Sequence, residues 1–328
     1  MTEQAARKFT YRELCTKECD IPIFAQAWWL DASAGPRNWD VVIVESENQI
    51  QAALPFYIRR RFGVTSLSTP PLTPALGPWL KAHSARSHKV IAREKKLLTE
   101  LYSQLPHCDL YLQNWHVSQL NWLPLYWMGY KQTTAYTYRL ENISDPGQVW
   151  AEMEQNTRND IRRGQERYHL TVRQAMSVAE FVSVCNKSFL RQGLTPPYDV
   201  SFVERIVLAA REHAAIELMV AGTSDGTPHA AAMILFGGDT AYYLMGGGDP
   251  NHRKSGAASL LLWEAILSCS GRSSIFDFEG SMIEPIERFF RGFGGQMTPY
   301  HTIYKANTLK GHGMLLAQAW KRSRSQKG

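Results

Sequence analysis

The stretch TAYYLMGGGDPNHRKSGAASLLLWEAI, residues 240–266, decides the fold class. Its first part is aromatic and apolar and ends in three glycines, which predicts a strand followed by a turn. Its second part begins with basic and small residues and continues as an apolar run, which predicts a buried helix. The function depends on whether the junction, residues 253–258, forms a phosphate-binding loop or only the entry to that helix.

This junction has the form R-x-x-G-x-A, which suits an anion at a helix N-terminus. The N–H groups of a first helical turn lack partners within the helix, and the helix dipole adds positive charge there. Small side chains let an anion approach these groups, and two basic side chains add full charges. Small residues also open many helices that bind nothing, so both interpretations stay open on the pattern alone. The predicted pyrophosphate-binding residues are Arg253, Lys254, Ser255, Gly256, Ala257 and Ala258.

The surrounding elements predict an α/β (α+β) protein with two copies of one fold. The segments IELMVAG, PHAAAMILFGG and TAYYLMGG read as three strands, and SSIFDFEGS and PYHTIYKA as two more. The first half repeats this pattern, because DVVIVESENQIQAALPFYI parallels the strand–turn–strand of residues 216–236. We expect domains at 1–143 and 144–310 and a C-terminal helix with a basic tail at 311–328. This helix either docks on the protein with its end in solvent or contacts RNA or anionic lipid.

Composition limits the function classes. The chain has 328 residues, 44% hydrophobic residues and a net charge of +6, which favours an anionic partner. No segment approaches the roughly 18 apolar residues of a membrane helix, and the polar start lacks a signal core, so we expect a cytoplasmic protein without a transmembrane segment. The five cysteines are scattered, which predicts free thiols and no metal site.

The order of these motifs resembles the GNAT acyltransferase superfamily, whose pyrophosphate loop Q/R-x-x-G-x-G/A occupies the same place. FFRGFGG is similar to that superfamily's aromatic-x-x-Gly-Phe helix end, slightly rearranged. With its doubled fold, the whole chain looks like the tandem-GNAT, Fem-like group of bacterial proteins, and VWAEMEQNTRNDIRRGQERYHLTV and FDFEGS resemble its leading helix and acidic strand end. The resemblance implies two tandem GNAT-like domains, each a mixed, mostly antiparallel sheet flanked by helices, with the donor site in the second.

Members of that group transfer an acyl or aminoacyl group to an amine. The resemblance therefore implies an N-acyltransferase that uses acyl-CoA as co-substrate and acts on a small-molecule or peptide amine in a cleft between the domains, with no role for DNA. One alternative is an aminoacyl-tRNA-dependent ligase acting on a peptidoglycan precursor. Another is a non-catalytic binding protein that has kept the fold. The R-x-x-G-x-A loop favours acyl-CoA, because the tRNA-dependent relatives do not need a tight cradle there.

The acidic strand end supplies the candidate base. Asp277 and Glu279 alternate along one predicted strand and should share a face, where one carboxylate raises the pKa of the other. Glu279 would act as base or amine ligand, or else only cap or pair with an arginine. His301 is a further candidate base, or a satisfied strand histidine. The superfamily often places an acid tyrosine on the next helix, and Phe289 and Phe290 stand there instead, which puts a direct acid step in doubt.

The acceptor is expected over the loop QGLTPPY, by resemblance to the superfamily's acceptor loop. Gln192 and Tyr198 could hydrogen-bond the acceptor there. Arg158, with Arg162 and Arg163 on the leading helix, could bind an acceptor phosphate, although such a run is also typical of a solvated helix face.

Overall fold

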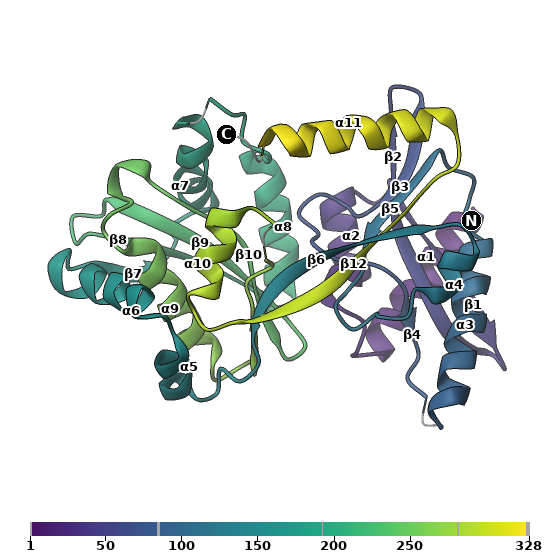
Figure 1. Ribbon diagram of the computed structural model, residues 1–328, viewed down its shortest axis with the longest axis horizontal. Helices are drawn as coiled ribbons and strands as arrows, with labels where there is room; N and C mark the ends of the chain where they lie inside the picture. Colours follow the sequence, from purple (N-terminus) through teal and green to yellow (C-terminus); the bar gives the residue numbers. More distant parts are fainter. Residues whose placement is uncertain (1, 84–85, 192, 281, 326–328) are drawn as a thin grey trace. The chain divides into compact units, whose positions relative to one another are not determined.

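The computed structural model describes residues 2–83, 86–191, 193–280 and 282–325, with side chains up to residue 320. The chain divides into two compact units (Figure 1). Unit 1 comprises Met1–Ala135 and Pro299–Gly328, and unit 2 comprises Tyr136–Thr298. Among the described residues, no helix combines the length and apolarity needed to cross a bilayer. All five cysteines are free, as expected.

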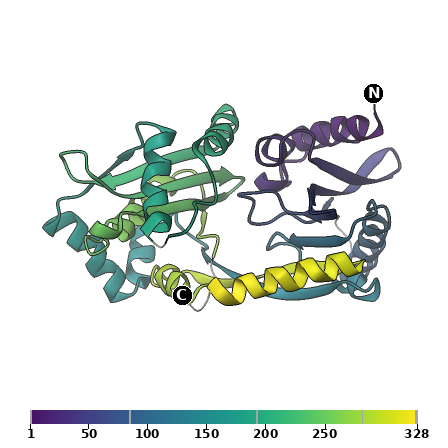
Figure 2. The ribbon, with the colours of Figure 1, turned by 90° about the horizontal axis from the view of Figure 1, so that it is seen from above.

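Unit 1 is a twisted sheet with helices on both faces. Its elements are α1 (Glu3–Lys17), α2 (Ala27–Ala34), β1 (Trp39–Ser46), β2 (Gln49–Arg61), β3 (Val64–Ser68), β4 (Trp79–Leu80), α3 (Ser87–Ser103), β5 (Leu110–Asn114), α4 (Leu123–Trp127), the greater part of β12 (Gln296–Ala306) and α11 (Leu309–Ser325). The strand order is β1-β2-β3-β5-β12, with β4 paired to β2. Helix α11 lies beside β3 and β5 (Figure 2).

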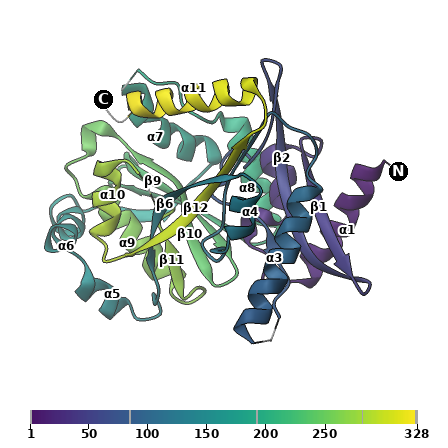
Figure 3. The same cartoon turned by 45° about the vertical axis from the view of Figure 1, so that its right-hand side comes forward.

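Alternation along β1 explains why both faces of this sheet are covered. Trp39 and Val41 pack with α1 and α2, whereas Val42 and Val44 pack with α3 on the opposite face (Figure 3). Side chains of successive strand residues point to opposite faces, so a strand that is apolar at consecutive positions needs a layer of helices on each side.

Unit 2 has the same layered architecture. Its elements are the second half of β6 (Lys131–Leu140), α5 (Pro146–Glu152), α6 (Gln155–Arg162) with a continuing π turn (Arg163–Arg167), β7 (Thr171–Gln174), α7 (Val178–Arg191), α8 (Val200–Glu212), β8 (Ile216–Gly222), β9 (Pro228–Gly237), β10 (Thr240–Gly248), α9 (Ala257–Cys269), β11 (Ile275–Asp277) and α10 (Glu284–Arg291). The strand order is β6-β11-β10-β9-β8-β7, antiparallel except for the β10–β11 pair. Helix α9 is apolar on nearly all sides and lies in the core.

Polar side chains mark the starts of several helices in unit 2. Asp145 caps α5 by accepting the Gln148 N–H, and Ser177 accepts the Glu180 N–H before α7. The segment SFVE, residues 201–204, has the pattern of a capping box at Ser201. That prediction is wrong, because Asp199 caps α8 through the Phe202 N–H and also accepts the Ser201 hydroxyl. Asp199 and Ser201 can both cap a helix, and the Asp199 carboxylate is the group that accepts the N–H at the start of α8.

The compact units differ from the predicted domain boundaries. We expected β6 to close the first copy and β12 the second, with the break at residue 143. Instead, β6 pairs with β11 inside unit 2, and residues 302–306 of β12 pair with β5 inside unit 1. Ladder hydrogen bonds join backbone groups that every residue carries, so the pattern of side chains does not determine which strand pairs with which.

Candidate functional site

The centre of unit 2 is a place where two parallel strands part. β10 pairs with β11 over Thr240 to Tyr242, and β11 then ends at Asp277, while β10 continues to Gly248. The β9–β10 ladder has a bulge between Tyr243 and Met245, which increases the local twist. The continuation of β10 therefore has a neighbouring strand in unit 2 on one side only. Ligand sites of α/β sheets commonly lie at such carboxyl ends.

The turn after β10 is held by two side chains of α7 and by Asp249 of the turn itself. Lys187 of α7 donates to Asp249 Oδ2 at 2.7 Å, and Asp249 Oδ1 accepts the Asn251 N–H at 2.9 Å. Ser188, also on α7, donates to the Gly248 carbonyl at 2.9 Å. The entry to the R-x-x-G-x-A loop is thus held in one conformation before any ligand binds.

Ser255 points into the protein. It is only 1% exposed, and its hydroxyl contacts His229 Nδ1 at 3.1 Å and accepts the Ala257 N–H at 3.3 Å. The ring of His229 stacks on His252 with ring centroids 3.8 Å apart. Burial lowers the pKa of His229, and neighbouring His252 lowers it further. Ser255 therefore holds the loop through contacts on its buried side. Arg253, Lys254 and Ala258 are exposed to solvent.

Gly256 is required by packing against α6. It adopts φ +79°, and a Cβ atom there would lie 2.0 Å from the Asp160 carbonyl oxygen. Gly164 makes a second close approach, because its Cβ would lie 3.3 Å from a methyl group of Leu260. Arg163, which lies between Asp160 and Gly164 in the sequence, approaches the Lys254 carbonyl at 3.5 Å. The segment NDIRRG therefore forms one wall of the loop and brings a third basic side chain beside Arg253 and Lys254.

Glu279 and Asp277 lie together, although not as expected. Glu279 comes after β11 with φ +57°, so the prediction that both residues alternate along one strand is wrong. Its backbone N–H donates to Asp277 Oδ1 at 2.8 Å. The buried Asp277 carboxylate thus holds the turn that presents half-buried Glu279 where β10 and β11 part.

Two residues of β6 complete this cluster, and no sequence pattern indicated either of them. Thr137 donates to Asp277 Oδ1 at 2.5 Å, and Arg139 Nε lies 3.6 Å from Asp277 Oδ2. Burial raises the pKa of Glu279 well above its usual range, the Asp277 charge adds to this, and Arg139 opposes it. Burial also raises the pKa of Asp277. Hydrogen bonds from Thr137 and the Glu279 N–H and the charge of Arg139 lower it and so oppose this shift. Asp277 has more partners that favour its ionised form, so Glu279 is the better proton acceptor of the two carboxyl groups.

Tyr242 is a further member that sequence reasoning missed. It is buried on β10 at the register position of Asp277. Burial raises its pKa, and the charges of Glu279 and Asp277 raise it further. The phenol therefore stays protonated beside the carboxylates.

The remaining predicted site residues do not join this cluster. His301 belongs to unit 1, where its Nδ1 contacts the Gln132 side chain at 2.9 Å; burial lowers its pKa, and a hydrogen bond to the Leu120 backbone opposes this shift. Arg158 donates to the carbonyls of Trp150, Ala151 and Met153 and so closes the C-terminus of α5. These contacts occupy Nδ1 of His301 and the guanidinium of Arg158.

Within the predicted acceptor loop, Tyr198 stacks on Phe202 with centroids 5.1 Å apart. Gln192 lies outside the described residues. No group of three or more His, Cys, Asp or Glu suited to a metal ion occurs in the described part of the chain.

Comparison with known proteins agrees with this architecture. Residues 151–281 match the family model for the acetyltransferase (GNAT) domain. The crystal structure of FemX superposes with a TM-score of 0.65 at 11% identity, covering 92% of this chain and 96% of FemX. The protein has a tandem-GNAT, Fem-like fold.

Two more solved structures share this tandem-GNAT fold. L-PGS from Bacillus licheniformis has a TM-score of 0.54 at 11% identity, with 95% of both chains covered. A tandem GNAT protein from the clavulanic acid biosynthesis pathway has a TM-score of 0.51 at 10% identity, with 92% of this chain and 94% of that chain covered. No curated protein sequence matches the chain. At these identities the likeness concerns the fold.

Proposed function

We propose that the protein is an N-acyltransferase that moves an acyl group from acyl-CoA to an amine. One observation carries the proposal: the R-x-x-G-x-A loop opens α9 at the same carboxyl edge of the sheet where β10 parts from β11 and Glu279 stands. An anion-binding helix end and a carboxylate with a raised pKa thus share one edge.

The donor would bind through its pyrophosphate at the start of α9. The Ala257 N–H is already taken by Ser255, so the N–H groups of Ala258 and Ser259 would face the anion. Arg253 and Lys254 would add charge at the rim. The open edge of β10 beyond Tyr242 would pair with the amides of an extended pantetheine arm, as an added strand does.

The transfer step needs a neutral amine. A lysine-type amine with pKa about 10.4 must lose a proton, which costs roughly 4.6 kcal/mol at pH 7. In the proposed step the amine nitrogen attacks the thioester carbonyl, its proton passes to Glu279, and CoA leaves as the thiolate. The raised pKa of Glu279 makes it a stronger base for this step than an ordinary carboxylate. Asp277, Thr137 and Arg139 would position Glu279, and the acceptor would enter beside Tyr198.

Thermal melting with acetyl-CoA, longer acyl-CoAs and free CoA tests the donor. Saturable stabilisation approaching roughly 2.7 kcal/mol at 100 times Kd is expected. Gly256→Glu is unsuitable as a test, because the new side chain would collide with the Asp160 backbone. Ala258→Glu is better, since Ala258 is exposed and an acid in a first helical turn favours the helix.

We expect Ala258→Glu to weaken acyl-CoA binding at least tenfold, about 1.4 kcal/mol, while the matched variant Ala258→Gln changes it far less. Unchanged affinity in the glutamate variant would refute the cradle. A flat response to every CoA compound would instead support an aminoacyl-tRNA donor, to be tested by a gel shift at low salt. CoA binding without transfer to any amine would leave the non-catalytic alternative.

A further inference from the structure

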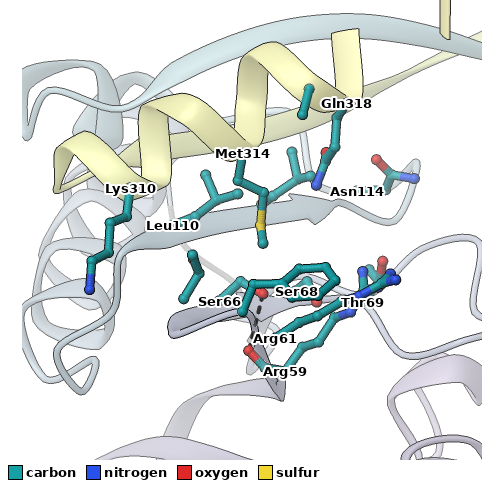
Figure 4. Close-up of a pocket in the computed structure, with 14 residues that line it drawn as sticks. Arg59, Arg61, Ser66, Ser68, Thr69, Leu110, Asn114, Lys310, Met314 and Gln318 are labelled. Atoms are coloured by element: carbon teal, nitrogen blue, oxygen red, sulfur yellow. Dashed lines mark hydrogen bonds between the residues drawn. The ribbon is translucent and has the colours of Figure 1, made fainter. Parts of the chain in front are cut away.

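Unit 1 contains a pocket that the proposed transfer reaction does not use. It has a volume of about 640 Å³ and lies among β2, β3, β5 and α11 (Figure 4). This is within the usual size range of small-molecule sites. Its lining includes Arg59, Arg61, Ser68, Thr69, Leu110 and Met314.

One part of the pocket is cationic. Arg59 and Arg61 are two apart on β2, so their side chains lie on the same face. Figure 4 shows the two guanidinium groups close together, on the side of Ser68 and Thr69. The residues that line the pocket include no carboxylate, and no described residue forms an ion pair with either guanidinium. Two like charges held together with hydroxyls nearby favour an anion, and guanidinium forks match phosphate oxygens.

The other part is apolar. Met314 projects from α11 into the pocket, opposite the aliphatic stems of the arginines, and Leu110 lies on the β5 side (Figure 4). A free phosphate ion would occupy the cationic part and leave this surface in contact with water. An alkyl chain would cover it, at roughly 0.8 kcal/mol for each buried methylene.

We propose that this pocket binds a phosphate group that carries an alkyl chain. The phosphate would lie on Arg59 and Arg61, and the chain would lie under Met314. The proposal stands on unit 1 alone and is independent of the acyl transfer proposed for unit 2.

The surface near the pocket favours a membrane lipid as the source. Phe62, at the tip of the β2–β3 hairpin, is 86% exposed and also lines the pocket. On α11, Leu309 and Leu316 are 92% and 73% exposed, and their spacing of seven places them on one face. The sequence from 308 to 328 contains six basic residues, counting His312, and no Asp or Glu. Exposed apolar side chains beside basic ones suit an anionic lipid surface.

The test measures binding by the full chain of monodecyl phosphate below its micelle concentration, of inorganic phosphate, and of vesicles of phosphatidylglycerol with phosphatidylcholine. The main variant is Arg59→Gln with Arg61→Gln. Its charge control is Arg60→Gln with Lys89→Gln, since Arg60 is exposed and falls on the opposite face of β2, and Lys89 is exposed on α3; neither lines the pocket. Met314→Asp is a second variant, which places a carboxylate in the pocket without touching the arginines.

We expect decyl phosphate to bind at least tenfold more tightly than inorganic phosphate, since two buried methylenes suffice for that. The double arginine variant and Met314→Asp should each weaken it at least tenfold, and the charge control less than twofold. Vesicle binding lost in the same variants would identify a membrane lipid, and its absence in the wild type would identify a soluble alkyl phosphate.

Three results would overturn the proposal. The first is no saturable binding of decyl phosphate. The second is equal weakening by the charge control, which would show that net charge alone is responsible. The third is binding of a single-stranded RNA oligonucleotide that depends on Arg59 and Arg61 while decyl phosphate does not bind.

Discussion

Replacing Gly256 by alanine is the sharpest test of how the proposed donor loop is built. The residue has φ +79° and ψ 5°, a left-handed conformation that costs an L-residue about 1–2 kcal/mol. The new Cβ would also lie 2.0 Å from the Asp160 carbonyl oxygen and 3.2 Å from the Gly164 N–H nitrogen. Both neighbours are backbone atoms, so α6 must move, at an overpacking cost of about 1–3 kcal/mol. The expected total loss of unfolding free energy is about 2–5 kcal/mol.

Gly226→Ala provides the matched control. Gly226 has φ +89°, and a Cβ there would meet nothing within 4 Å. Both variants share the left-handed cost and the change in unfolded-chain entropy, so the difference between them isolates the collision with Asp160. Urea denaturation of both variants measures this difference in unfolding free energy. Titration with acetyl-CoA measures whether the loop still binds the proposed donor. If Gly256→Ala costs no more than Gly226→Ala, α6 does not pack on the loop as described.

Further predictions concern the carboxylate cluster and Arg158. Glu279→Gln should lower the rate of acyl transfer by roughly 10²- to 10⁴-fold if Glu279 is the base. Because the folded-state pKa of Glu279 is raised, the wild type should lose stability relative to this variant as the pH rises from about 4.3, the usual glutamate value, toward the folded-state pKa. Urea denaturation from pH 4 to 8 measures this, and a difference independent of pH would contradict the raised pKa. Arg158→Ala should cost about 1.5–3 kcal/mol of unfolding free energy by freeing the α5 carbonyls and leave donor and acceptor KM unchanged; a raised acceptor KM with unchanged stability would instead restore its predicted role as a phosphate ligand.

Local chemistry explains what could be predicted from the sequence. The polar caps at Asp145 and Ser177 act on N–H groups three residues away, so their effect is visible in a short window. The strand–turn–helix around residues 253–258 is local in the same sense, and the tandem-GNAT fold followed from the order of such segments. Glu279 was identified as a candidate because it lies at the carboxyl end of a predicted strand, where ligand sites of α/β sheets commonly open.

Contacts between distant segments could not be predicted. Thr137 reaches Asp277 across 140 positions of sequence, and only the pairing of β6 with β11 brings them together. Arg158 looked like a free cation in a basic run, because the carbonyls that it caps carry no side-chain signal.

Local sequence patterns specify the order of helices and strands, the place of the R-x-x-G-x-A loop and the acid at the end of β11. These depend on periodicity, small residues and caps that act within a few positions. Only the folded chain shows that β6 pairs with β11 and β12 with β5, each across the predicted boundary. It also shows that Ser255 faces His229 and that Gly256 packs against the backbone of α6. The physical reason is that backbone hydrogen bonds and close packing join groups that every residue carries, so their partners are fixed by the path of the whole chain.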